Sequence, residues 1–97
     1  MVKSLNEAIL YIYNGTLPAS YAFKPQFKLF YSYVEAWVVQ GKLTSLYRLK
    51  SIIRERVLSY SEFLKQNSHI TDVSSYVETF YFYRYLFMKL FVEEENG

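Results

Sequence analysis

Phe80-Tyr-Phe-Tyr-Arg-Tyr-Leu-Phe-Met-Lys-Leu-Phe-Val92 is the stretch that decides the fold of this chain. Eleven of its thirteen residues are apolar or aromatic, and only Arg84 and Lys89 carry charge. A helix on the surface of a globular protein keeps one polar face, and this segment has almost none. We therefore expect it to be buried in the domain, covered by a partner, or laid against a membrane surface.

The same stretch is predicted to be helical, although Tyr and Phe also favour strands. A strand over residues 76–91 would be longer than the roughly three to ten residues of most strands. We therefore predict a helix over 72–93, capped by Thr71 or Ser75, and a frayed tail over 94–97. The side chains expected on its main apolar side are Val73, Tyr76, Val77, Phe80, Tyr83, Phe87 and Leu90.

Two helices are predicted in the N-terminal half. Ser4-Leu-Asn-Glu7 has the spacing of a capping box, so a helix is expected over 5–14, where Asn14-Gly15 ends it. Pro25 is well tolerated at the first position of a helix and predicts a second helix over 25–40.

A third helix is predicted over 45–66, with Thr44 or Ser45 as its cap. Its apolar residues recur at spacings of three and four, as expected for one buried face: Leu46, Leu49, Ile53, Val57, Tyr60 and Leu64. Ser59-Tyr-Ser-Glu62 also has capping-box spacing, which leaves open a break near Leu58.

The four expected helices predict an all-α fold, a small single-domain bundle of about four helices with a very aromatic C-terminal helix. The chain has 97 residues, the size of one domain. Aromatic residues make up 21% of it, including eleven Tyr. Because a core of this size cannot hold them all, several Tyr are expected at the surface or in an interface, where their polar tips suit them.

The sequence gives few signs of its compartment. There is no cysteine, which excludes disulfides and thiolate chemistry. Asn6 and Glu7 interrupt the apolar core that a signal peptide would need. The apolar run over 80–92 is shorter than the roughly twenty residues of a membrane span. We therefore expect a soluble, cytoplasmic protein with no membrane span.

No catalytic residue, metal, cofactor or small-molecule substrate is predicted. His69, the only histidine, sits beside Ser68 in an expected turn, and adjacency alone does not make a nucleophile and its base. Asp72 is the only Asp, and Glu93–Glu95 lie on the expected tail. Glu55 and Glu62 are typical of a solvated helix face. We therefore expect that the protein is not an enzyme.

Basic residues form the first candidate site. Residues 1–56 hold eight Lys and Arg against three Glu, whereas residues 57–97 hold three against six acidic residues. Basic side chains neutralise phosphates and aromatic rings stack on bases. The candidate nucleic-acid-binding residues are Lys42, Tyr47, Arg48, Lys50, Arg54 and Arg56. Two other interpretations stay open: these charges only flank a buried stripe, or they meet an acidic protein partner.

The segment Gly41-Lys-Leu-Thr-Ser-Leu-Tyr-Arg-Leu-Lys50 resembles the turn of a helix–turn–helix. The resemblance is generic and covers about twenty residues. It implies that the helix over 45–66 reads DNA.

Aromatic residues of the last helix form the second candidate site. The residues expected off its main apolar side are Tyr81, Phe82, Tyr85, Leu86, Met88, Phe91 and Val92. The candidate interface residues chosen from these are Tyr81, Phe82, Tyr85, Met88 and Phe91. Complete burial of this helix is the alternative, and two basic residues are too few for membrane-surface binding. We predict a non-enzymatic interaction module, an accessory subunit or homodimer associated with a nucleic-acid-handling assembly. Its partner is another protein or a second copy, and a DNA-binding protein is the alternative.

Overall fold

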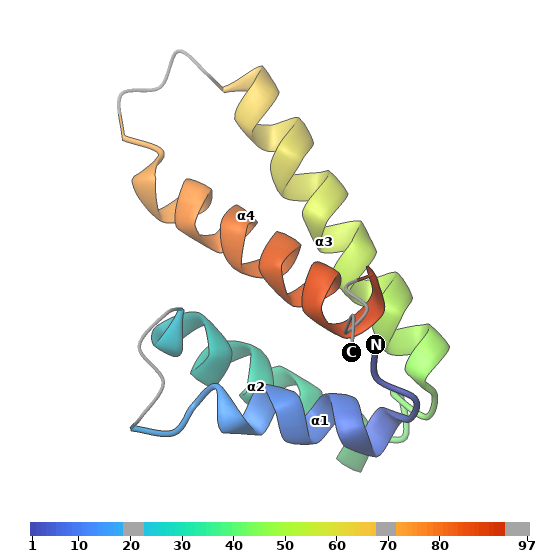
Figure 1. Cartoon of the computed structure of the whole chain (residues 1–97). Coiled ribbons are helices and arrows are strands. Elements are labelled where there is room, and N and C mark those ends of the chain that lie inside the picture. The colour runs from blue at the N-terminus through green and yellow to red at the C-terminus, as the bar shows by residue number, and fades with distance from the viewer. Residues whose placement is uncertain (19–22, 68–71, 93–97) are drawn as a thin grey trace. The chain divides into compact units, whose positions relative to one another are not determined.

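The computed structural model describes residues 1–18, 23–67 and 72–92, and within these residues every regular element is a helix. The elements, in order, are α1 (Leu5–Asn14), α2 (Lys24–Val39), α3 (Leu46–Gln66), α4 (Ser74–Phe87) and the π-helical turn η1 (Met88–Val92) (Figure 1). The all-α prediction is confirmed, and so is the choice of helix over strand for most of residues 76–91. None of these helices is both long and apolar enough to cross a membrane.

Contacts between residues group the chain into two compact units. The first is Val2–Leu49, and the second is Lys50–Gly97 together with Met1. In the first unit α1 lies alongside α2, and in the second α4 lies alongside the main part of α3 (Figure 1). The single domain predicted from chain length stays a prediction.

The start of α1 follows the predicted capping box. The backbone N–H of Glu7 donates to Ser4 Oγ at 3.1 Å. The Glu7 carboxylate accepts from the N–H of Lys3 at 2.9 Å, one residue before the cap. At the other end the N–H of Gly15 donates to the carbonyl of Tyr11 at 3.2 Å. The predicted bounds of 5–14 are therefore confirmed.

Large and small side chains fit together in the first unit. Its buried residues on α1 and α2 are Ala8, Ile12, Phe27, Phe30 and Val34. The rings of Tyr11 and Phe27 meet at 6.3 Å between centroids. Gly15 is buried as well, and a Cβ there would overlap the Phe27 ring. The glycine thus makes room for a core aromatic.

A residue with left-handed backbone conformation flanks α2 on each side. Phe23 precedes it with φ 61° and makes no side-chain cap, while Pro25 lies in the first turn as predicted. After the helix, Gly41 has φ 73°, and the N–H groups of the next two residues donate to the carbonyl of Trp37 at 2.8 and 3.2 Å. The helix runs one residue earlier than predicted at both ends.

Ser45, not Thr44, caps α3, because its Oγ accepts from the backbone N–H of Arg48 at 3.1 Å. The helix continues through Leu58, so the break considered there is absent. Leu49 and Ile53 of the predicted stripe are fully buried.

The last helix begins at Ser74, two residues later than predicted. Asp72 Oδ1 accepts from the Ser74 hydroxyl at 2.9 Å, and Val73 is the cap residue without a side-chain hydrogen bond. Thr71 lies outside the described residues, and Ser75 lies inside the helix, so it is not the cap. After Phe87 the backbone turns π-helical, which the prediction of a helix to residue 93 did not include.

The buried side of α4 and η1 differs from the predicted one. The buried residues are Phe82, Tyr83, Leu86, Leu90 and Phe91, and Tyr76 is exposed. Tyr83 and Leu90 are buried as predicted, whereas the buried Phe82, Leu86 and Phe91 were expected off the main apolar side. Because this segment is apolar all round, the spacing of its apolar residues cannot identify which side faces the core.

Candidate interaction surfaces

The predicted interface residues divide into exposed and buried sets. Tyr81, Tyr85 and Met88 are 50%, 37% and 44% exposed. Phe82 and Phe91 are buried, so their inclusion in the predicted interface was wrong: a buried side chain presents no area to a partner.

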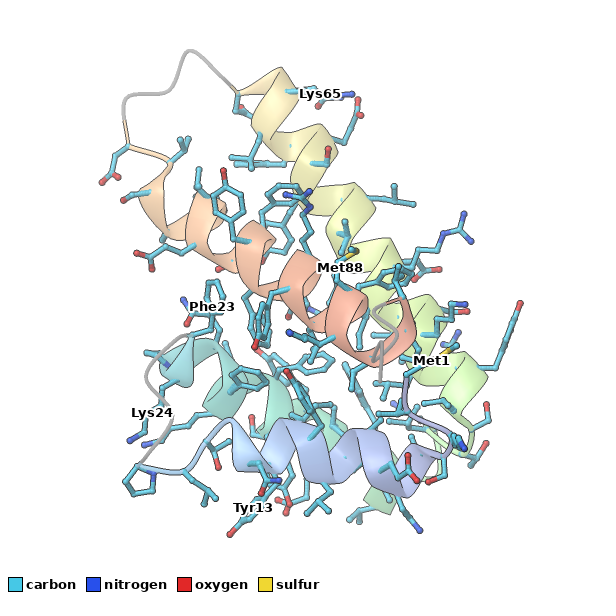
Figure 2. All side chains as sticks on the ribbon, in the orientation of Figure 1. Met1, Tyr13, Phe23, Lys24, Lys65 and Met88 are labelled. Atoms are coloured by element: carbon cyan, nitrogen blue, oxygen red, sulfur yellow. The ribbon has the colours of Figure 1, made fainter. Side chains whose placement is uncertain are left out.

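Four exposed apolar residues form one line along α4 and η1, which we call the α4 stripe: Tyr81, Tyr85, Met88 and Val92. Its spacings of four, three and four keep side chains on one face of a helix. Met88, which is labelled in Figure 2, is the first residue of the π-helical turn. Charges lie at both ends of the stripe. Glu78 is exposed one turn before Tyr81, and Lys89 Nζ lies 5.8 Å from the centre of the Tyr85 ring. Val92 belongs to this surface although the predicted site residues did not include it.

The candidate nucleic-acid residues fall in both units. In the first unit Lys42, Tyr47 and Arg48 are exposed, and Tyr47 reaches 79%. In the second unit Arg54 is exposed, and the exposed Lys50 has its Nζ 5.9 Å from the centre of the Phe91 ring.

Arg56 differs from the other basic candidates because its side chain contacts Tyr83 in the same unit. Its Nη1 donates to the hydroxyl of the buried Tyr83 at 3.2 Å, and its guanidinium carbon lies 5.5 Å from the centre of that ring. Arg56 is half-buried, so it is removed from the exposed basic set. The helix–turn–helix interpretation stays a prediction.

An aromatic cluster joins α3 to α4 in the second unit. Tyr83 stacks on Tyr60 at 5.8 Å, and Phe63 meets Tyr76 at 4.6 Å between ring centroids. An open pocket of about 280 Å³ lies at this cluster, lined by Ser59, Tyr60, Phe63 and Tyr76. It was not among the predicted sites, because it needs side chains from two helices.

A second pair of tyrosines lies in the first unit. The rings of Tyr13 and Tyr31 are 5.4 Å apart. Desolvation, and then the charge and hydrogen bond of Glu35, raise the pKa of Tyr31 above its ordinary value. A tyrosine so shifted stays protonated at neutral pH and donates to the carboxylate, which does not favour a nucleophilic role.

Among the residues that the structure describes, those considered for catalysis and metal binding form no assembled site. Ser68, His69 and Glu93–Glu95 lie outside the described residues. Glu55 and Glu62 are both exposed, and Glu62 accepts from Gln66 Nε2 at 3.1 Å. Across residues 1–18, 23–67 and 72–92, no three His, Asp or Glu side chains come together as metal ligands would.

Comparisons with protein-family models, curated proteins and solved structures found no significant match to this chain. Its function must therefore be inferred from the surfaces described above.

Proposed function

We propose that this protein is a non-enzymatic interaction module that pairs with a second copy of itself through the α4 stripe. The observation that carries the proposal is the line of four apolar side chains, each at least 37% exposed, on one helix face. Removing such a line from water is favourable, at roughly 25 cal/mol per Å² of apolar area. Tyrosine and methionine are also enriched in the cores of protein interfaces.

Charges at the two ends of the stripe favour an antiparallel pair. Glu78 lies beyond the N-terminal end of the stripe and Lys89 near its C-terminal end. In a two-fold symmetric pair with antiparallel α4 helices, the acidic end of each stripe meets the basic end of the other. A parallel pair would instead bring like charges together.

The pair is expected to be weak. A standard interface uses roughly 20–30 residues on each side, and one helix face offers fewer. Weak pairing suits an accessory subunit that exchanges partners, and the exposed basic residues would let its assembly lie near nucleic acid.

Substitutions in two exposed positions test the proposal. Met88→Glu places a charge in the stripe and should weaken association about tenfold or more, measured by sedimentation equilibrium. Leu58→Glu is the matched control, because Leu58 is exposed on α3 outside the stripe. Equal effects of the two substitutions would contradict the proposal.

A charge exchange tests the antiparallel arrangement separately. Glu78→Lys alone should weaken pairing modestly, since exposed ion pairs contribute roughly 0.2–1 kcal/mol. Adding Lys89→Glu should restore it. If the double variant does not recover pairing, the antiparallel arrangement is contradicted. Pairing through the α4 stripe itself would not be contradicted by that result.

DNA binding is the second candidate, favoured by Tyr47, an aromatic side chain that is 79% exposed and directly precedes Arg48. Binding of duplex DNA, followed by fluorescence anisotropy, should fall steeply with salt. A Lys50→Glu/Arg54→Glu variant should abolish it. Salt-independent binding, or no loss in the variant, would rule out this candidate.

A further inference from the structure

We propose that the aromatic pocket between α3 and α4 binds an arginine side chain of a partner protein. The pocket is distinct from the α4 stripe, so this inference does not depend on self-pairing. Its size is the first argument. At about 280 Å³ it lies below the roughly 300–1,000 Å³ of most small-molecule sites, and it is open to solvent. It therefore suits one inserted side chain better than a whole ligand.

The lining of the pocket favours a cation. Three of its four lining residues are aromatic: Tyr60, Phe63 and Tyr76. Ring faces carry partial negative charge and attract cations within about 6 Å. Tyr76 is 43% exposed, so part of its surface is available to an incoming group.

The same cluster already accepts a guanidinium. Arg56 lies 5.5 Å from the centre of the Tyr83 ring, and Tyr83 in turn stacks on Tyr60, which lines the pocket. Guanidinium is planar and weakly hydrated, so it stacks on aromatic faces at a lower desolvation cost than an ammonium group. This contact within the chain indicates which cation the pocket would prefer.

Charge near the pocket complements such an occupant. Glu55 and Glu62 precede and follow Ser59 by four and three residues, so all three lie on one face of α3. Both carboxylates are exposed. They would attract an arginine of the partner and offset the repulsion from Arg56.

Binding of blocked single amino acids tests the inference. N-acetyl-arginine methylamide should shift the NMR signals of the Tyr60, Phe63 and Tyr76 rings. The citrulline analogue has nearly the same shape without the charge, and should bind about 2- to 30-fold more weakly, as expected for a cation–π contribution. Equal binding of the two compounds, or no shift at the highest soluble concentration of arginine, would overturn the proposal.

Two tyrosines on the same helix provide the matched variants. Tyr76→Leu removes a ring that lines the pocket and should weaken arginine binding. Tyr81→Leu removes a ring of similar exposure that does not line the pocket and should leave binding unchanged. The proposal fails if both variants lose binding equally. Met88→Glu, which should lower self-association, changes a residue that does not line the pocket and should leave arginine binding unchanged, which separates the two proposals.

Discussion

Gly15 and Gly41 serve the fold for different physical reasons. Gly15 has an ordinary backbone with φ −66°, but a Cβ there would overlap the Phe27 ring. Gly41 has open space around its Cα and a left-handed φ of 73°. We expect Gly15→Ala to cost about 1–3 kcal/mol through overpacking. Gly41→Ala should cost about 1–2 kcal/mol through backbone strain.

Asparagine distinguishes these two causes, because it tolerates the left-handed region better than alanine does. Urea unfolding should show Gly41→Asn to be less destabilising than Gly41→Ala. At Gly15 the order should reverse, since Asn is larger than Ala. The same order at both positions would show that one of these causes is misassigned.

The Arg56–Tyr83 contact has a polar and an aromatic part that can be separated. Tyr83→Phe removes the 3.2 Å hydrogen bond and keeps the ring over which the guanidinium lies. It should cost about 0.5–1.5 kcal/mol of unfolding free energy. Tyr83→Leu also removes the stacking on Tyr60 and should cost more, as measured by urea unfolding. Equal losses of unfolding free energy in the two variants would mean that the Tyr83 ring contributes nothing to stability.

The ends of the helices were predictable where local side chains fix them. Ser4 and Ser45 bind N–H groups three residues ahead, and both starts were predicted to within a residue. The start of α4 was not, because Val73 offers no side-chain hydrogen bond to the helix. The π-helical turn at Met88–Val92 has no comparable local signal in the sequence.

Capping of α1 gives a prediction for a single element. Ser4→Ala removes the acceptor of the Glu7 N–H and should destabilise the protein by about 1 kcal/mol, within a range of roughly 0.5–2. Ser4→Asp keeps an acceptor and should recover most of the loss in thermal unfolding. An unchanged midpoint of thermal unfolding for Ser4→Ala would mean that this cap does not stabilise the protein.

The candidate surfaces were only partly predictable from the sequence. An interface on the last helix was predicted. Because that helix is apolar on every side, its sequence does not show which side is buried, and Phe82 was therefore placed wrongly. The pocket requires Tyr60 and Phe63 to meet Tyr76 across two helices, and no sequence spacing reports that contact. Arg56 was grouped with the basic surface because its contact with Tyr83 is also tertiary.

At the scale of the whole molecule, salt separates the two candidate functions. The formal net charge is only +2, and the α4 stripe is apolar, so self-association should change little with ionic strength. Nucleic-acid binding through the exposed basic residues should weaken strongly as salt rises, because it depends on counterion release.

Light-scattering mass of the purified protein across a dilution series, at low and high salt, tests the central claim most directly. Pairing through the α4 stripe predicts a mass that rises from 11.6 kDa at low concentration toward twice that value, with similar midpoints at both salt concentrations. A mass that stays at 11.6 kDa at every concentration, or association that disappears at high salt, would contradict it.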